Sequence, residues 1–482
     1  MTVVHDRIIA SIMPQLQRAD MEGSLLFCGA GVSPAHPSHC QDLQAGTPAP
    51  QLPRGSRMLR VLASAFACGP RWGSEIGMGW NWVRHLSDLC ELTVITEAEF
   101  RKDIEEELAG GRLASPPQMH YIDIGQAARR RCWNQGDWRF YLDYRRWQKQ
   151  ACELASRLIQ SGKFDLLHQL NMTGYREPGY LWQLPLPLVW GPVGGHAQMP
   201  WRFLPGLGLK GSVYHACRNV LNAVQMRVSR RVGRCAKQAG AVVASTLADQ
   251  QAIKRIHRRP CLLMNEQGSA SLHRCNTRKQ SDSAGPLRIA WVGKLVSRKA
   301  LGLAVRSLAA MKCKNAATLE IVGDGPDGPS CKALARSLGV ADACRWHGAI
   351  SHEAALDVMA SCDCLMMTSL QEGTPATLME AISLHLPIIC HDVCGFSSVV
   401  DDSCGIKVPP RSPTQSVRAF AAAMDRLAAD RDYLSHLSEG SAQAAAEHSW
   451  QNKARWMIDV YQQVLDAATS RPHTCNATEM TV

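Results

Sequence analysis

The sequence predicts an α/β protein made of two Rossmann-like domains with parallel sheets. Its 482 residues exceed what a single hydrophobic core usually serves, so two domains are expected. Short apolar runs alternate with helical patterns in two series along the chain, as parallel sheets require. A polar segment, His273 to Gly285, separates the two series.

The first series begins at Met58. Residues 1–57 are rich in Pro, Ser and Gly near their end, and we expect a poorly ordered extension there. Residues 58–272 are predicted to form the amino-terminal domain, with a glycine-rich turn over Gly69–Gly79 and a helix over Trp80–Leu89. The predicted strands are Met58–Ala65, Leu92–Thr96, His120–Ile124, Asp165–Leu170, Leu186–Trp190 and Ala241–Ser245.

The second series follows a predicted linker over residues 273–286. Residues 287–411 are expected to form the carboxy-terminal Rossmann-like domain, and residues 412–482 Ala-rich helices and a tail. Ser412 and Pro413 suit the cap and first turn of the first of these helices. The predicted strands are Leu287–Val292, Thr318–Val322, Cys344–His347, Cys364–Thr368 and Pro387–Cys390.

The nineteen cysteines favour reduced thiols that pack as small hydrophobic side chains. Their number is odd, the chain is long, and no CxxC pair is present, so neither a disulfide framework nor a metal site is expected. Cys364 and Cys390 fall within predicted strands, and Cys68 and Cys394 in loops just after strands.

No membrane span and no cleavable signal sequence are expected. The long uncharged stretch Pro178–Trp201 contains five prolines, which a lipid-exposed helix would not tolerate. The first residues mix charges with short apolar pieces and lack a continuous hydrophobic region. The sequence therefore predicts a cytoplasmic protein, with peripheral attachment to the inner face of the membrane left open.

The most informative motif is the stretch Ser369–Glu380, which follows a predicted strand. In an open α/β sheet this is the edge at which ligands bind. Thr374 is expected to cap a helix with Pro375 at its first position, leaving the backbone N–H groups of the first turn free for an anion. Glu372 precedes the cap and Glu380 lies inside the helix, an arrangement that suits the hydroxyls of a sugar and of a nucleoside.

Two further loops belong to the same predicted edge. Lys294, Arg298 and Lys299 follow the strand that ends at Val292, and cations there can neutralise a diphosphate leaving group. The tight turn Gly323–Pro326 follows the next strand and allows a ligand to approach the backbone. Taken alone, the basic loop is better explained as a solvated surface loop, and the tight turn is weak evidence for a site.

The order of these motifs resembles the carboxy-terminal domain of family 4 glycosyltransferases, which are retaining enzymes of the GT-B fold. Four motifs carry the resemblance between about Leu287 and Val408: G-K-L-V-x-x-K, I-V-G-D-G-P, H-G-x-I and E-G-T-P-x-x-x-x-E. In the first series, Gly73–Trp80, Phe164–His168 and Trp190–Gly195 resemble a bacterial branch that makes exopolysaccharides.

The resemblance implies a division of roles between two domains that face each other across a cleft. Glu372 would contact the donor sugar, Lys294 and Lys299 the diphosphate, Glu380 the ribose, and Gly73 would lie under the donor from the amino-terminal, acceptor-binding domain. It implies no cofactor and no metal, because lysines and helix amides neutralise the charge. The implied catalytic residues are Glu372, Lys299 and Lys294. The implied donor-binding residues are Gly73, Gly293, Gly323, Ile350, Gly373, Thr374, Pro375, Thr377, Leu378 and Glu380.

The sequence departs from the family pattern at several positions. Lys294 stands where arginine is usual, which keeps the charge but loses the bidentate fork. Ala300 replaces a usual glycine, and Leu384–Pro387 replaces a turn of small residues. His168 and His196 are both candidates for the acceptor side, in structural or positioning roles, and no catalytic base is assigned.

A basic, partly apolar stretch from Trp201 to Lys237 supports a separate hypothesis. An amphipathic basic helix can lie on an anionic membrane surface, where a lipid-linked acceptor would be presented. The alternative is a solvated helix face.

The function that the sequence favours is transfer of a hexose from a nucleotide-diphosphate sugar to a saccharide or lipid-linked saccharide, in polysaccharide or glycolipid biosynthesis. One alternative is a GT-B-fold epimerase that acts on the nucleotide sugar itself. Another is a non-enzymatic protein that binds anionic polymers, suggested by the net charge of +11. No basic–aromatic pattern typical of nucleic-acid binding is present, so nucleic acid is not an expected partner.

Overall fold

The computed structural model describes residues 57–133, 139–270, 285–313 and 315–470. The predicted extension lies outside the described residues except for residue 57, and so do most of the predicted linker and the end of the predicted tail.

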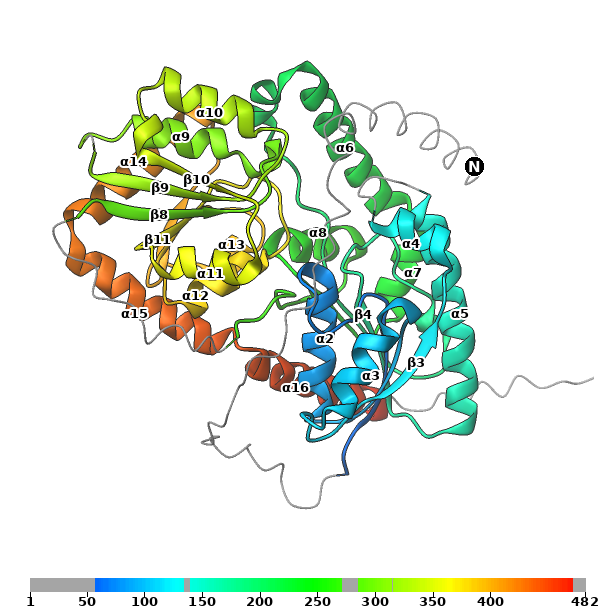
Figure 1. Cartoon of the computed structure of the whole chain (residues 1–482). Helices are drawn as coiled ribbons and strands as arrows, with labels where there is room; N and C mark the ends of the chain where they lie inside the picture. The colour runs from blue at the N-terminus through cyan, green and yellow to red at the C-terminus, as the bar shows by residue number, and fades with distance from the viewer. Residues whose placement is uncertain (1–56, 134–138, 271–284, 314, 471–482) are drawn as a thin grey trace, which may run out of the picture.

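The first domain is a seven-stranded parallel sheet with helices on both faces (Figure 1). Its strand order is β3-β2-β1-β4-β5-β6-β7, and every printed pair is parallel. The elements are β1 Arg60–Ala65, α2 Ser74–Ser87, β2 Glu91–Glu97, η1 Ala98–Phe100, α3 Arg101–Ala109, β3 Gln118–Ile122, α4 Gln126–Trp133, α5 Phe140–Ser161, β4 Leu166–Asn171, η2 Leu181–Gln183, β5 Leu188–Val193, η3 Trp201–Leu207, α6 Gly208–Val228, α7 Arg230–Gln238, β6 Ala241–Ala244, α8 Leu247–His257 and β7 Leu262–Leu263.

The second domain is a six-stranded parallel sheet in the order β10-β9-β8-β11-β12-β13. The elements are β8 Leu287–Val292, η5 Ser297–Lys299, α9 Leu301–Ala309, β9 Ala317–Val322, α10 Gly328–Ser337, η6 Ala341–Ala343, β10 Cys344–Gly348, α11 His352–Ala360, β11 Cys364–Met367, α12 Ala376–Ser383, β12 Ile388–His391, α13 Phe396–Val399, β13 Gly405–Val408, α14 Pro413–Ala429, α15 Arg431–Glu447 and α16 Trp450–Thr469. The prediction of two Rossmann-like parallel sheets is confirmed.

Each sheet reverses its strand order once, between β1 and β4 in the first domain and between β8 and β11 in the second. In open parallel sheets the loops at such a switch point diverge and leave a crevice for a ligand. The switch point of the second sheet therefore lies between the loop after β8 and the loop after β11, the two loops that the sequence analysis singled out.

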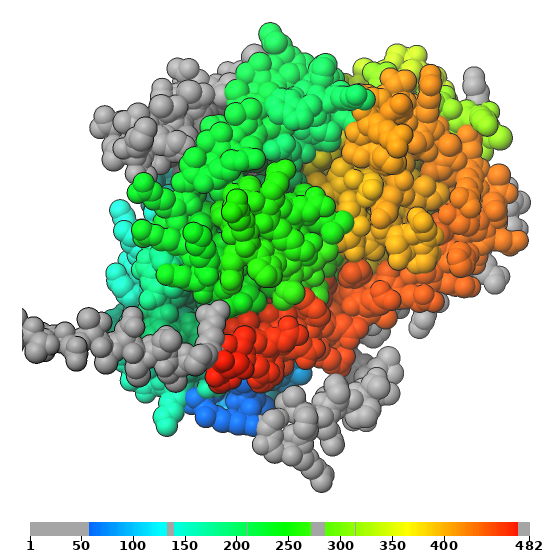
Figure 2. Space-filling view, turned by 180° about the vertical axis from the view of Figure 1, so that it is seen from behind, coloured from blue at the N-terminus to red at the C-terminus, as the bar shows by residue number. Residues whose placement is uncertain are grey.

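The last helix, α16, returns to the first domain. Trp450, Met457 and Tyr461 are buried in the same hydrophobic core as the first sheet. The indole rings of Trp450 and Trp82 meet edge to face, with 5.7 Å between their centroids. In the view from behind, α16 lies against the surface of the first domain and continues into the helices of the second (Figure 2). The chain thus crosses between the domains twice.

The predicted turn over Gly69–Gly79 is wrong, because α2 already begins at Ser74. Gly77 and Gly79 lie inside the helix, where a Cβ atom would stand 2.0 Å from the carbonyl oxygens of Trp72 and Ala67 respectively. These glycines serve close packing of the helix against the loop and strand before it, and they do not form a turn.

The cysteines of the described residues are all free thiols. Cys364 lies in β11 and Cys390 in β12, and both are fully buried. Burial raises the pKa of the Cys394 thiol to about 12, so this side chain is neutral at physiological pH.

In the described part of the chain, no helix combines the length and the apolar composition needed to cross a bilayer. The stretch Pro178–Trp201, expected to be strand and loop, contains η2 and β5.

Candidate functional site

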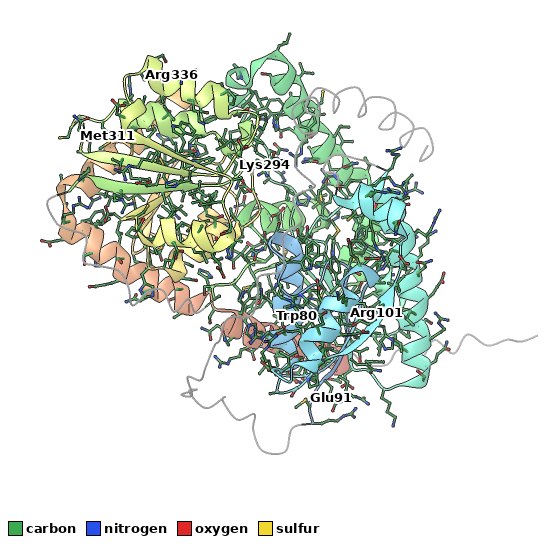
Figure 3. All side chains as sticks on the ribbon, in the orientation of Figure 1. Trp80, Glu91, Arg101, Lys294, Met311 and Arg336 are labelled. Atoms are coloured by element: carbon green, nitrogen blue, oxygen red, sulfur yellow. The ribbon has the colours of Figure 1, made fainter. Side chains whose placement is uncertain are left out.

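The carboxyl edges of the two sheets are turned toward each other. Glu91, at the start of β2, lies on the side of the first domain that faces away from the second (Figure 3). Lys294, just after β8, lies on the side of the second domain that faces the first (Figure 3). The strand ends of both domains, where parallel sheets bind ligands, therefore border the same interdomain region.

A cluster of two cations and one carboxylate occupies the switch point of the second sheet. One carboxylate oxygen of Glu372, Oε1, lies 2.8 Å from Nζ of Lys299 and 2.7 Å from Nη1 of Arg298. Lys299 is only 8% exposed. A lysine withdrawn from water to this degree keeps its charge at low cost only beside a carboxylate. The structure thus brings together two of the predicted catalytic residues, whereas Lys294 is exposed on the same loop.

Backbone geometry on both sides of Lys299 fixes this cluster. Gly293 has φ +154°, and the Lys299 side chain passes over it, with Cε 3.4 Å from the place where a Cβ would be. The hydroxyl of Thr368 donates to the carbonyl of Lys299 over 2.9 Å, and the indole N–H of Trp291 donates to that hydroxyl. Both partners are buried strand-end residues, so the lysine is anchored to the sheet.

Two departures from the family pattern coincide with left-handed backbone. Ala300, at the start of α9, has φ +52°, and His385, after α12, has φ +57°. A non-glycine residue in this region costs roughly 1–2 kcal/mol relative to the right-handed conformation. The turns are therefore retained here although glycine is absent from them.

The predicted nucleoside side of the site is a stack of glycine backbones. A Cβ at Gly323, which has φ +129°, would stand 2.0 Å from the carbonyl oxygen of Gly293. The N–H of Gly323 donates to the carbonyl of Gly348 over 2.8 Å. The loops after β8 and β9 can therefore approach each other this closely only with glycine at position 323, and Ile350, just after β10, is exposed.

The predicted cap of the helix after β11 is wrong by one residue. Pro375 is the N-cap of α12, and the helix starts at Ala376. Thr374 instead gives both its backbone N–H and its hydroxyl to the carboxylate of Glu266, over 2.7 and 3.0 Å. The N–H of Leu378 donates to the carbonyl of Pro375, so one of the first-turn amides predicted to be free is engaged in this structure. Thr377 lies in the first turn of the helix.

Glu380 and Gly73 border the site from opposite domains. Glu380 accepts a hydrogen bond from Nε2 of His352 over 2.8 Å, at a partly exposed position on α12. Gly73 is the N-cap of α2, at the carboxyl edge of the first sheet, and a Cβ there would meet no atom within 4 Å. Both glycines are exposed, but a Cβ at Gly373 would stand 2.4 Å from the Glu266 carboxylate.

Both candidate histidines are held inside the first domain. His168 is fully buried, with Nε2 2.7 Å from the carbonyl of Gly191 and Nδ1 2.6 Å from the hydroxyl of Tyr461. The carbonyl can only accept, so Nε2 carries the proton and Nδ1 accepts from the tyrosine. Burial lowers the pKa of His168 to about 4, which keeps the ring neutral. This packing makes His168 a core residue of the first domain.

His196 lies closer to the domain boundary. Its Nδ1 lies 2.9 Å from Oδ1 of the buried Asp249, which also accepts the backbone N–H of His196. Its ring stacks on Tyr175 with 3.9 Å between centroids, and its Nε2 faces the sulfur of Met226. The ring is thereby fixed in orientation, as a positioning residue would be.

The loop after β11 is wedged against the first domain. Leu370 is buried in a small hydrophobic cluster with Met199, Phe203 and Leu204. Gln371 accepts a hydrogen bond from Arg218 of α6 over 2.9 Å and donates to the carbonyl of Ala197. A relative movement of the two domains would therefore shift the neighbouring Glu372.

Glu266 is the main residue of this region that the sequence analysis missed. It follows β7, a two-residue strand too short to show a pattern, and its partner Thr374 is 108 positions away. The neighbouring Asn265 accepts a hydrogen bond from Lys453 of α16 through its carbonyl, over 3.1 Å. The sequence around Glu266 contains no motif or periodic pattern that would have identified it as a site residue.

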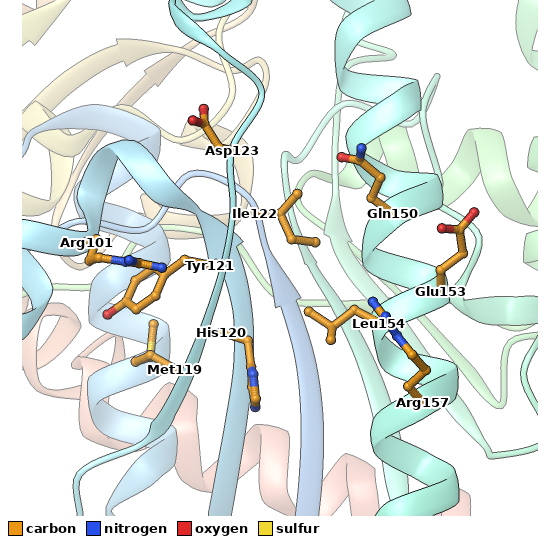
Figure 4. Close-up of a pocket in the computed structure, with 10 residues that line it drawn as sticks. All are labelled: Arg101, Met119, His120, Tyr121, Ile122, Asp123, Gln150, Glu153, Leu154 and Arg157. Carbon is orange, nitrogen blue, oxygen red and sulfur yellow. The ribbon is translucent and has the colours of Figure 1, made fainter.

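A separate groove of about 710 Å³ lies on the outer side of the first domain, between the edge strand β3 and helix α5 (Figure 4). Ile122 of β3 and Leu154 of α5 point into the space between these two elements (Figure 4), and four of the lining residues are charged. None of the predicted site residues contributes to it. The lining residues are Arg101, Met119, His120, Tyr121, Ile122, Asp123, Gln150, Glu153, Leu154 and Arg157.

Comparison with known proteins agrees with this geometry. Residues 286–430 match the family model described as Glycosyl transferases group 1. The matched range contains the whole second sheet and therefore the Lys299–Glu372 cluster.

Curated relatives match a limited part of their length. The chain is 24% identical over 180 residues to alpha-D-kanosaminyltransferase from Streptomyces kanamyceticus, covering 36% of this chain and 45% of that enzyme. It is 27% identical over 142 residues to D-inositol 3-phosphate glycosyltransferase from Corynebacterium urealyticum, covering 29% and 32%. The chain thus spans less than half of the length of these relatives.

Solved structures share the whole architecture. Anabaena HepE in complex with UDP is similar with a TM-score of 0.54 at 14% identity, covering 86% of this chain and 100% of that one. A glycosyltransferase from Rickettsia africae is similar with a TM-score of 0.55 at 12% identity, covering 85% and 99%. The two-sheet fold is therefore that of GT-B glycosyltransferases. Within this class, the second domain of the chain is the one that matches the glycosyl transferases group 1 family.

Proposed function

We propose that this protein is a retaining glycosyltransferase that moves a hexose from a nucleotide-diphosphate sugar to a saccharide or lipid-linked saccharide. The observation that carries the proposal is the cluster of Lys299, Arg298 and Glu372 at the switch point of the second sheet. A buried lysine and a partly exposed arginine beside a carboxylate, on a loop that faces the other domain, suit a diphosphate leaving group and a hydroxylated sugar.

In the proposed reaction the bond between the anomeric carbon and the diphosphate oxygen breaks. The acceptor's hydroxyl oxygen bonds to the same face of the carbon, and its proton passes to the released diphosphate. Lys299, with Arg298 and Lys294 on the same loop, would stabilise the charge that develops on the leaving group. No metal ion and no cofactor are part of this proposal.

The environment of the carboxylates argues against a glycosidase mechanism. Glycosidases use two opposed carboxyl groups, one as acid and one as nucleophile or base. Glu372 is instead paired with two cations, and Glu380 belongs to the helix that starts after the same loop. Neither is placed as a nucleophile from the opposite face of a sugar, so we propose that leaving-group stabilisation and domain closure supply the rate.

The relatives favour bacterial polysaccharide or glycolipid biosynthesis. HepE was solved with UDP, and the curated relatives include a D-inositol 3-phosphate glycosyltransferase and a protein named as a putative teichuronic acid biosynthesis glycosyltransferase. A uridine diphosphate sugar is therefore the first donor to examine, and a cytoplasmic site of action is part of the proposal.

A transfer assay tests the proposal. The protein is incubated with UDP-, GDP- and ADP-sugars, with and without a bacterial lipid extract, and released nucleotide and sugar products are measured. We expect release of one nucleoside diphosphate that depends on the extract. A new sugar nucleotide formed without any acceptor would instead identify the epimerase alternative, and no turnover with any donor would contradict both.

Helix α6 supports a further element of the proposal, contact with an anionic membrane. Leu209, Val213, Val220, Val224 and Val228 are all exposed, with Leu209 at 83% and Val220 at 53%. Their spacing of four, seven, four and four residues places them along one face of the helix. No acidic residue occurs in the sequence between Glu177 and Asp249.

This apolar stripe is followed by the strongly basic helix α7, whose Arg230, Arg234 and Lys237 are exposed. An apolar face flanked by cations binds bilayers through buried area and attraction to anionic lipids together. We propose that the first domain rests on the membrane through α6 and α7, which would place the acceptor side next to a lipid-linked saccharide.

Flotation with vesicles measures this contact. Wild-type protein should float with phosphatidylglycerol-containing vesicles and remain unbound with phosphatidylcholine alone. Changing Val220 and Val224 to aspartate should lower the bound fraction about tenfold, because each change removes apolar burial and adds repulsion. Leu338→Asp, at an exposed position of the second domain, is the matched control and should bind as wild type. Equal binding to both kinds of vesicle, or none to either, contradicts the membrane contact.

A further inference from the structure

Glu266 joins three parts of the molecule at one buried position. It follows β7 on the segment that leaves the first domain, and it is 7% exposed. Its backbone carbonyl accepts the indole N–H of Trp82, in α2, over 2.9 Å. Its carboxylate accepts the backbone N–H of Thr374 over 2.7 Å and the hydroxyl of Thr374 over 3.0 Å. One residue thus fastens the loop before α12 to the first domain.

The carboxylate lies on the part of the loop that the proposed donor would use. A Cβ at Gly373 would stand 2.4 Å from Oε1 of Glu266, so a larger residue at this position would displace the carboxylate. The backbone N–H of Thr374, among the amides proposed to meet donor oxygens, is already bonded to the same oxygen. The Thr374 amide therefore already binds an anion, the carboxylate of Glu266.

We infer that Glu266 is an additional donor-site residue, whose carboxylate occupies the Thr374 amide until an anionic or hydroxyl oxygen of the donor replaces it. This inference rests on the proposed function. Binding of the donor would release the segment after β7 from the loop before α12. Because that segment connects the two domains, the exchange would link donor binding to their relative movement.

The charged surroundings of Glu266 agree with an exchangeable contact. Burial raises its pKa to about 6, an effect to which the nearby Asp249 of α8 adds and which the Thr374 bonds oppose. Lys453 of α16 is the nearby basic residue, and burial lowers its pKa to about 7, so it is largely uncharged at pH 7.5. The thiol of Cys394 also faces this region and is neutral. Glu266 is therefore ionised at pH 7.5 and would repel a diphosphate placed beside it.

Asn265 limits how far the segment can move. Nζ of Lys453 donates hydrogen bonds to both the carbonyl and the side-chain oxygen of Asn265. Lys453 is 1% exposed and belongs to α16, which packs in the first domain. If Glu266 were released, the segment would therefore move while Asn265 stayed attached to the first domain.

The test compares Glu266→Ala and Glu266→Gln with wild type at pH 7.5. Glu177→Gln is the matched control, because Glu177 is an equally buried carboxylate that pairs with Arg145 and Arg231 away from the site. Calorimetric titration with UDP measures affinity. Hydrogen exchange of peptides that contain Thr374 measures whether its amide is held.

Glu266→Ala should bind UDP about tenfold more tightly than wild type, because a charge-assisted hydrogen bond no longer competes for the amide. Its Thr374 amide should exchange faster in the absence of nucleotide. Glu266→Gln, which keeps an acceptor oxygen but loses the charge, should lie between the two, and Glu177→Gln should match wild type.

Equal or weaker UDP binding by Glu266→Ala overturns the inference while leaving the proposed function intact. Unchanged exchange of the Thr374 amide in that variant overturns it as well. If neither UDP, GDP nor ADP binds to wild type or to any variant, the proposed function fails, and this inference fails with it.

Discussion

Replacing Lys299 by alanine should lower glycosyl transfer by about 10²–10³-fold, because one preorganised charge that stabilises a leaving group is worth this order of magnitude. The side chain is nearly buried and lies 2.8 Å from Glu372, so no mobile surface lysine can take its place. Initial rates at saturating donor and acceptor measure the effect.

Lys312→Ala is the matched control for this change. Lys312 is an exposed lysine of the same domain, beyond the end of α9, and its replacement should leave the rate unchanged. Circular dichroism should show that both variants are folded. A rate for Lys299→Ala within about threefold of wild type would remove this residue from the site.

Replacing Trp450 by alanine should lower the free energy of unfolding by about 3–5 kcal/mol, the usual cost of removing a large buried aromatic side chain. The indole ring packs against Trp82 of α2, stacks on His85, and lies where a Cβ at Gly268 would be 2.5 Å from its Cδ2. It thus joins α16, α2 and the segment between the domains. Urea unfolding followed by circular dichroism measures the loss.

Trp201→Ala controls for loss of an indole ring alone. Trp201 is 53% exposed, and its replacement should change stability by less than about 1 kcal/mol. Equal unfolding midpoints for the Trp450 and Trp201 variants would show that α16 does not contribute to the core of the first domain in solution.

The sheets could be predicted because buried parallel strands leave a local signal. The predicted run Leu287–Val292 coincides with β8, and Thr318–Val322 matches β9 except for one residue. The position of the candidate site could also be predicted, because the strand order places the ends of β8 and β11 next to each other. The loops after these two strands carry the basic residues and the glutamate that mark the site. A two-residue strand such as β7 leaves no such pattern.

What sequence reasoning missed depends on contacts between distant segments. Threonine often caps helices, but the hydroxyl of Thr374 instead donates a hydrogen bond to Glu266, which lies across the domain boundary. Gly77 and Gly79 look like turn residues, but tight packing against neighbouring backbone places them in a helix. His168 resembles a site residue, but its two ring nitrogens are used inside the core. In each case a tertiary contact overrides the local preference.

The central claim is that a nucleoside diphosphate binds at the switch point of the second sheet through Lys299. Equilibrium titration of wild type, Lys299→Ala and Lys312→Ala with UDP, GDP and ADP tests it most directly. We predict that one of these nucleotides binds to wild type and to Lys312→Ala alike, and at least about tenfold more weakly to Lys299→Ala, since a buried charge-assisted contact is lost. Binding of no nucleotide to wild type, or equal binding to all three proteins, would contradict the claim.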